Sequence, residues 1–162
     1  MKNLFLLFII CLSFACGNNA NQKTDEPAQT PTASTPQLPE NTSLDGNYCF
    51  VASYGVDSLY QDTTAVRLTI IGNKVTGTYD WIPAGKDSGR GTLSGTIADN
   101  IITALYDYTI EGSNQQEEKV FRLEDNQLVE KRGELHEVNG VLKLKNPETA
   151  TFSAVLPKVD CG

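Results

Sequence analysis

The sequence has little of what most metal and catalytic sites are made of. Its 162 residues include one histidine, His136, and four cysteines. A single imidazole and so few thiols leave a zinc site short of ligands, so we expect no bound metal. The chain also lacks His-Glu-x-x-His, Ser-x-x-Lys, a glycine-framed serine and a phosphate-cradling glycine loop. We therefore expect no cofactor and no enzymatic activity.

Positive charge is also scarce. Thirteen basic residues stand against twenty acidic ones, which gives a formal net charge of −7. Nucleic acids and anionic lipid surfaces are held by clustered Lys and Arg, so the balance excludes both as partners of the folded part. An acidic protein remains compatible with a cationic partner, and acidity also simply favours solubility.

One apolar run stands at the start of the chain. A short positive start, Met1-Lys2-Asn3, precedes an apolar stretch over 4–14 and a small residue, Ala15. The run is too short to span a bilayer stably, and the three parts together are typical of a secretory signal peptide over 1–15.

The residues that follow carry a resemblance. Ala15-Cys16 followed by Gly17-Asn18-Asn19 resembles the lipobox of bacterial lipoproteins. Cys11 does not compete, because it lies inside the apolar core behind the bulky Ile10. The resemblance implies that Cys16 carries a diacylglycerol and an amide-linked acyl chain such as palmitate. Several acyl chains make an effectively permanent anchor, so we expect a membrane partner through this lipid and a place in the cell envelope, at the periplasmic face or the cell surface of the outer membrane.

Two cysteines remain after the signal is removed and Cys16 is acylated. An even remainder in an oxidising compartment predicts a disulfide between Cys49 and Cys161. The pair would close a loop of more than a hundred residues, worth about 4–5 kcal/mol on chain-entropy grounds.

Composition then divides the chain. Asn, Gln, Thr, Ser and Pro dominate 17–44, which cannot bury enough apolar surface to offset its ordering entropy. We therefore expect 16–44 to be an acylated cysteine and a disordered tether, and 45–162 to be a single folded domain.

The folded part alternates between apolar and polar residues with a period of two, and turn signals recur about every thirteen residues. This pattern predicts strands and no helix. Eight segments fit it: 47–54, 64–71, 74–81, 91–98, 101–109, 116–124, 127–136 and 141–145. The sequence therefore predicts an all-β fold, an eight-stranded antiparallel up-and-down barrel, wide enough to be filled by side chains or to hold one small ligand.

Successive connections in such a meander fall on opposite ends. The two-residue turns at 72–73, 99–100 and 125–126 share one end, and the longer connections 55–63, 82–90 and 112–115 share the other, with the tight Asn139-Gly140 turn. Loops on a rigid scaffold and barrel mouths are where binding residues concentrate. The candidates for binding a ligand or partner at this loop end are Tyr60, Trp81, Lys86, Asp87 and Arg90. Trp81 and Tyr79 fall on the inward face, where a role in the core competes with a role in binding.

Glycine and aromatic residues recur on these strands. Gly46-Asn47-Tyr48, Val75-Thr76-Gly77-Thr78-Tyr79 and Leu93-Ser94-Gly95-Thr96 resemble the strands of calycin-type barrels such as lipocalins and avidins. Ser88-Gly89-Arg90-Gly91 resembles the start of the Ser-Gly-x-x-Tyr loop of bacterial lysozyme-inhibitor lipoproteins, with Thr92 where the Tyr would stand.

Three hypotheses about function follow. The leading one is a lipid-anchored envelope protein whose barrel binds a small ligand or a protein partner at its loop end. The alternative is an inhibitor of a cationic enzyme such as lysozyme, captured electrostatically. The third is a hydrolase using Glu130, Glu134 or His136, which alternate on the segment 127–136. We expect these three residues to lie instead on an exposed polar face of the sheet.

Overall fold

A computed structural model describes residues 43–55 and 60–162 of the chain. The predicted signal peptide over 1–15, the Cys16 anchor and almost all of the predicted tether lie outside the described residues. Within the described part there is no helix, and hence none long and apolar enough to cross a membrane.

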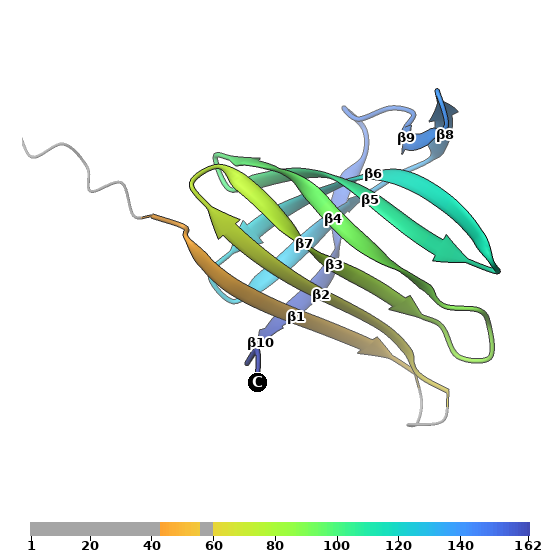
Figure 1. Ribbon diagram of the computed structural model, residues 1–162, viewed down its shortest axis with the longest axis horizontal. Coiled ribbons are helices and arrows are strands. Elements are labelled where there is room, and N and C mark those ends of the chain that lie inside the picture. Colours follow the sequence, from red (N-terminus) through yellow and green to blue (C-terminus); the bar gives the residue numbers. More distant parts are fainter. Residues whose placement is uncertain (1–42, 56–59) are drawn as a thin grey trace, which may run out of the picture. The chain divides into compact units, whose positions relative to one another are not determined.

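Ten strands make up the described part, and eight of them close into an antiparallel barrel (Figure 1). They are β1 (Gly46–Tyr54), β2 (Asp62–Ile71), β3 (Lys74–Ile82), β4 (Gly89–Ala98), β5 (Ile101–Ile110), β6 (Ser113–Glu124), β7 (Gln127–Arg132), β8 (Leu135–Val138), β9 (Val141–Leu144) and β10 (Thr151–Val159). Strands β1 to β7 pair in sequence order, and β10 pairs with both β7 and β1 to close the ring. The predicted all-β up-and-down barrel is confirmed.

The closing strand is not the one the sequence predicted. The segment around 141–145 forms β9, which pairs with β8 in a short hairpin and lies parallel to β6 at Gln116 and Glu117. The barrel is closed instead by β10, which no predicted strand covers. A register shift between Phe152 and Ala154 interrupts the alternation of β10 with a bulge, so its period-two pattern is broken in the sequence.

The predicted strand over 127–136 is also divided. It ends as β7 at Arg132, and the chain resumes as β8 at Leu135. Glu130 is 3 % exposed and shares the inward phase of Leu128, which is fully buried. The prediction of an exposed polar face is therefore wrong for Glu130, and it holds for Glu134 and His136, which are exposed.

The connections fall at the two ends as the meander requires. Turns at 72–73, 99–100 and 125–126 lie at one end, and the β3–β4 and β5–β6 connections lie at the other, here called the mouth (Figure 1). β1 ends and β2 begins at the mouth as well, and 56–59 between them lie outside the described residues. The β5–β6 connection is shorter than predicted, because Glu111 and Gly112 form a two-residue turn with positive φ at both positions, the geometry of type I′ hairpins. The polar residues 113–115, predicted as loop, belong to β6.

The core is the inward-facing set of these strands. Its fully or almost fully buried side chains are Phe50, Val66, Leu68, Ile70, Val75, Leu93, Ile102, Phe121, Leu128 and Leu156. Glycines on β4 let neighbouring strands approach closely, since a Cβ at Gly91 would clash with the carbonyl oxygen of Asp107 on β5. Leu44, which the composition placed in the tether, packs against this core and accepts a hydrogen bond from Tyr48 Oη at 2.8 Å.

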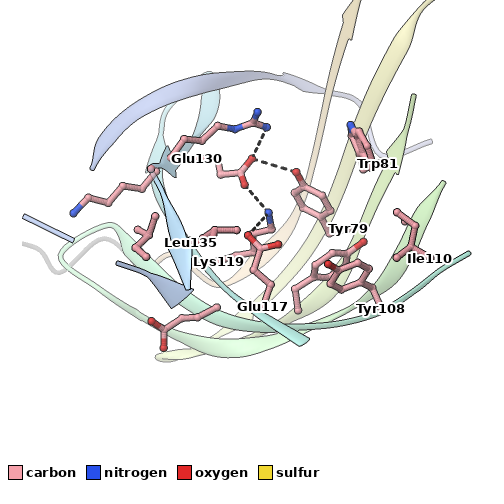
Figure 2. Close-up of a pocket in the computed structure, with 15 residues that line it drawn as sticks. Tyr79, Trp81, Tyr108, Ile110, Glu117, Lys119, Glu130 and Leu135 are labelled. Carbon is pink, nitrogen blue, oxygen red and sulfur yellow. Dashed lines mark hydrogen bonds and ion pairs between the residues drawn. The ribbon is translucent and has the colours of Figure 1, made fainter. Parts of the chain in front are cut away.

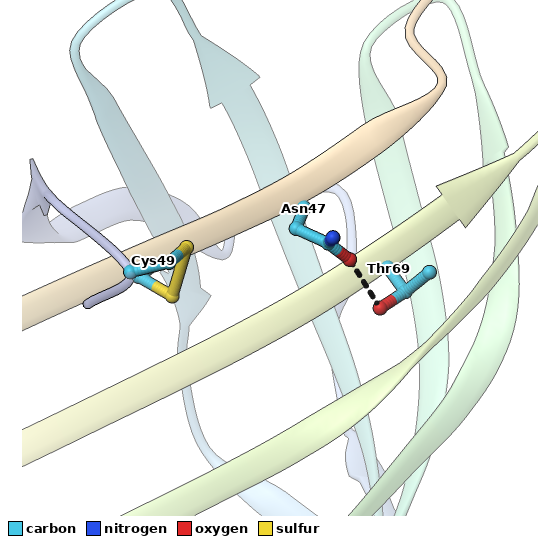
Figure 3. Close-up of a disulfide and its surroundings, with 4 residues drawn as sticks. Asn47, Cys49 and Thr69 are labelled. Carbon is cyan, nitrogen blue, oxygen red and sulfur yellow. Dashed lines mark hydrogen bonds between the residues drawn. A yellow bond between two sulfur atoms is a disulfide. The ribbon is translucent and has the colours of Figure 1, made fainter.

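The disulfide lies where the barrel is most weakly closed. Strands β1 and β10 share two register pairs, Cys49 with Val159 and Phe50 with Lys158, whereas β5 and β6 share ten. Cys49 bonds to Cys161 beside this short ladder, with the Cα atoms 5.2 Å apart (Figure 3). The predicted disulfide is confirmed, and it fastens the end of the chain to the first strand.

Candidate functional site

A cavity of about 340 Å³ opens at the mouth of the barrel. Strands β3 to β7 contribute its inner wall, and the β8–β9 hairpin adds Leu135 and Leu144 (Figure 2). The cavity exists because the β6–β7 ladder stops at the pair Phe121 and Glu130. Beyond that pair the two strands separate, and β9 takes the free edge of β6. β6 and β7 are therefore apart on the mouth side of this pair. The inward side chains between the core and the mouth line the cavity.

Aromatic rings form one wall of this cavity. Tyr79 and Tyr106 are both 3 % exposed, and their ring centroids lie 4.9 Å apart in a tilted arrangement. Tyr108 stacks on Tyr106 with centroids 4.3 Å apart and interplanar angle 5°. Trp81, 38 % exposed, continues the wall outward along β3. Such rings offer large, rigid apolar surface to a ligand at low conformational cost.

Glycine makes room for this wall. Gly89, at the start of β4, also lines the cavity. A Cβ placed there would lie 3.5 Å from Tyr108 Cδ2 and 3.6 Å from Tyr106 Oη, which is ordinary van der Waals contact. Because glycine has no side chain, the space next to Gly89 is part of the cavity. A larger side chain at this position would fill some of that space.

Four charged side chains of alternating sign, here called the charge chain, form a second wall. Lys119 Nζ lies 2.8 Å from Glu117 Oε1 and 2.8 Å from Glu130 Oε1. Arg132 Nη2 lies 3.0 Å from Glu130 Oε2, and Tyr79 Oη donates to the same oxygen at 3.2 Å. The side chains of Glu117, Lys119 and Glu130 are at most 13 % exposed, whereas that of Arg132 is 55 % exposed at the rim. The charge chain joins the separated strands β6 and β7 across the split seam.

This environment shifts the ionisation of its members. Burial alone would raise the pKa of Glu130, but Lys119 and Arg132 outweigh it and hold that pKa below the usual range of a carboxyl. Burial would lower the pKa of Lys119, and Glu130, Tyr79 and Glu117 reverse the effect and raise it. Both groups are therefore charged at neutral pH.

The pKa values of the cavity tyrosines are raised, whereas that of Glu130 is lowered. Burial, followed by the charge of Glu130, raises the pKa of Tyr79 to about 12. Burial also raises the pKa of Tyr106 and of Tyr108. All three phenols are therefore neutral over the physiological range. The Tyr106 hydroxyl is the one buried side-chain polar atom without a hydrogen-bond partner in the part of the chain that the structure describes.

The residues predicted from sequence lie at the predicted end, but only one lines this cavity. Trp81 does so. Arg90 points to the outside of the barrel, where its Nη1 lies 3.7 Å from Asp80 Oδ2. Lys86 is exposed in the β3–β4 connection, and Asp87 lines a shallow depression beside the β5–β6 turn. Tyr60, 67 % exposed, lies in the β1–β2 connection.

The lysozyme-inhibitor resemblance falls mainly on a strand. Gly89 pairs with Trp81 and Arg90 with Asp80 in the β3–β4 ladder. Three of the four residues Ser88-Gly89-Arg90-Gly91 therefore belong to β4, and the geometry gives no projecting loop there.

Sequence reasoning named Tyr79 and Glu130 but missed Glu117, Lys119 and Tyr106, and it did not bring the charge chain together. A signal for them was present in the strand phase. Glu117 and Lys119 alternate in step with Phe121 and Leu123, which are buried on the inward face of β6. Glu130 is likewise in step with Leu128 on β7. Polar residues that continue an apolar phase toward a barrel mouth mark a polar interior.

Comparison with known proteins gives no relative. No protein-family model matches the chain, and neither a curated protein nor a solved structure does.

Proposed function

We propose that this protein is a lipid-anchored component of the cell envelope whose barrel binds a small molecule in its mouth, without catalysing a reaction. The observation that carries the proposal is the cavity lined by Tyr79, Trp81, Tyr106 and Tyr108 beside the charge chain. Its volume of about 340 Å³ falls at the lower end of the range of known small-molecule sites.

The position of the cavity supports binding from solution. Trp81 and Arg132 are partly exposed at its rim, while Tyr79, Tyr106 and Glu130 are buried at its base. The groups at the base are held by the ladder of the barrel and by mutual ion pairs, so the site is formed before a ligand arrives. A preformed site loses less entropy on binding than one that must be ordered.

The proposed anchor completes the function. With Cys16 acylated and 17–43 serving as a tether, the barrel would work beside a membrane without inserting into it. Cys16→Ala tests this part. The variant should be recovered as a soluble or unprocessed species, and a variant with its signal removed that still partitioned into detergent like the parent would contradict the anchor.

Recovery of the bound molecule tests the binding function. The full-length protein is isolated from its native envelope in detergent, denatured, and the released compounds are identified by mass spectrometry. A cavity-filling variant, Gly89→Leu, provides the comparison. Thr76→Leu is the matched control, because it adds the same side chain on the exposed outer face of β3.

We expect one compound to be enriched with the parent and with Thr76→Leu but absent with Gly89→Leu. Retention of the same compound by a folded Gly89→Leu variant would place binding elsewhere. Absence of any enriched compound would count against a resident ligand, and a panel of added probes, described below, would then decide whether the site binds at all.

A further inference from the structure

The charge chain is electrically neutral, and its two middle residues each have an oppositely charged partner on both sides. Lys119 lies between two carboxylates, and Glu130 lies between two cations, with every contact at 3.0 Å or less. A ligand with a net charge would add an uncompensated charge to a cavity whose own charges already cancel. Burying such a charge is costly unless it is paired.

The two ends of the charge chain still have hydrogen-bonding capacity. Glu117 uses Oε1 for Lys119, and its other oxygen has no hydrogen-bond partner among the described residues, so it can accept one. Arg132 uses Nη2 for Glu130, while a guanidinium has five N–H donors. One cavity therefore presents an acceptor on β6 and donors on β7. A purely apolar ligand would strip both of water without replacing the lost hydrogen bonds.

Hydroxyl groups fit both ends, because a hydroxyl donates to a carboxylate and accepts from a guanidinium. The rings of Trp81 and Tyr108 call for a ligand with a flat face of C–H groups, whose partial positive charge suits the negative face of an aromatic ring. The Tyr79 ring lies deeper and already faces Lys119 Nζ, 4.9 Å from its centroid. An uncharged ring that carries several hydroxyls on its edge combines the two properties.

We infer that the ligand of the mouth cavity is a neutral carbohydrate, stacked by one ring face on the aromatic wall and held by its hydroxyls between Glu117 and Arg132. The inference rests on the proposed binding function and narrows it to one chemical class.

Trp81 supplies the readout, since it lines the cavity and is the only tryptophan of the chain. The full-length protein, in a detergent without a sugar headgroup, is titrated with three sets of probes while the emission of Trp81 is followed. The first set contains neutral glycosides of glucose, galactose, mannose and N-acetylglucosamine, with their disaccharides. The second contains glucuronate, galacturonate and glucosamine, and the third an uncharged apolar dye, N-phenyl-1-naphthylamine.

We expect at least one neutral glycoside to bind at least tenfold more tightly than its acidic and amino counterparts. Variants then test the charge argument. Glu117→Gln should weaken that glycoside about tenfold, as loss of a hydrogen bond to a charged group does, and should strengthen the acidic sugar because the cavity gains net positive charge. Arg132→Gln should weaken the glycoside likewise and strengthen the amino sugar. Asp125→Asn, an exposed residue in a turn at the opposite end, should change none of these affinities.

The outcomes separate the inference from the function on which it rests. Binding of the dye or of a charged sugar in preference to every neutral glycoside would overturn the carbohydrate assignment and leave small-molecule binding standing. Equal affinity of the acidic sugar for the parent and for a folded Glu117→Gln variant would also overturn the assignment. No response to any probe would overturn the assignment and the proposed function together.

Discussion

Replacement of Lys119 by methionine should destabilise the barrel strongly. Lys119 is 11 % exposed at its side chain and forms ion pairs with both Glu117 and Glu130. Breaking a buried ion pair from one side costs about 3–5 kcal/mol, because the remaining charge stays buried. Glu130 keeps Arg132 and Tyr79 as partners, so we expect the lower end of this range, about 3 kcal/mol.

Urea unfolding followed by far-UV circular dichroism measures this loss, with the disulfide intact. The matched control is Lys74→Met, an exposed lysine at the start of β3, which should change the free energy of unfolding by no more than about 0.5 kcal/mol. The double variant Lys119→Met with Glu130→Gln should lose little more than Lys119→Met alone. Once Lys119 is absent, removing the charge of Glu130 relieves part of the penalty.

The pH dependence of the loss has a definite sign. The pKa of Glu130 is lowered in the folded protein, so its ion pairs stabilise the fold above the unfolded pKa of about 4.5, and this contribution disappears as the pH falls through the folded value. The difference between the parent and Lys119→Met should therefore be full at pH 7 and shrink below about pH 4.5. A loss under about 1 kcal/mol at pH 7, or one that stays constant down to pH 3, would refute a buried, functional ion pair.

Three further predictions concern the tyrosines and the disulfide. The pKa of Tyr79 is raised to about 12, so it stabilises the fold fully below pH 10 and loses this contribution as the pH rises to about 12; the ionisation absorbance at 295 nm that Tyr79→Phe removes should be centred near pH 12, and its appearance near pH 10 would contradict this. Tyr106→Phe should leave the free energy of unfolding unchanged or raise it by about 1 kcal/mol, because the buried hydroxyl has no partner among the described residues; a loss above about 1 kcal/mol would mean that the hydroxyl is satisfied. Replacing Cys49 and Cys161 by Ser should cost about 4 kcal/mol in urea unfolding, since the bridge spans 112 positions; a cost near zero would show that the β1–β10 seam holds without it.

Strand alternation was enough to predict the barrel. Val66, Leu68 and Ile70 on β2 are all buried, and the polar residues between them face outward, as the period-two pattern requires. The turn residues between the strands, such as Gly72-Asn73 and Asp99-Asn100, predicted where the meander turns. Because successive connections alternate between the two ends, the positions of the turns also predicted which connections share the mouth.

Closure of the barrel could not be predicted in the same way. β10 carries Pro157 and a bulge near Phe152, both of which weaken the alternation on which strand prediction depends. The segment 141–144 was predicted as a strand of the barrel, yet it forms β9, which pairs with β8 in a hairpin outside the barrel ring. Which of two candidate strands meets β1 is decided by long-range pairing and by the Cys161 bridge, not by local sequence.

The sequence predicted the end of the barrel at which the candidate site lies, but not most of the residues that line it. Exposed loop residues such as Lys86 and Asp87 were favoured because loops carry function in most barrels. The structure instead assembles the cavity from inward strand residues, where β6 and β7 separate. Where they separate, β9 pairs with β6 at Gln116 and Glu117, a long-range contact that the local sequences of β6 and β7 do not predict.

The most direct test of the central claim is a crystal structure of the protein isolated from its native envelope. If a small molecule is bound in the mouth, we expect continuous electron density that the chain does not explain. It should lie against the faces of Trp81 and Tyr108 and within hydrogen-bonding distance of Glu117 or Arg132. A cavity closed by the protein's own side chains, with β6 and β7 drawn together, would contradict the claim.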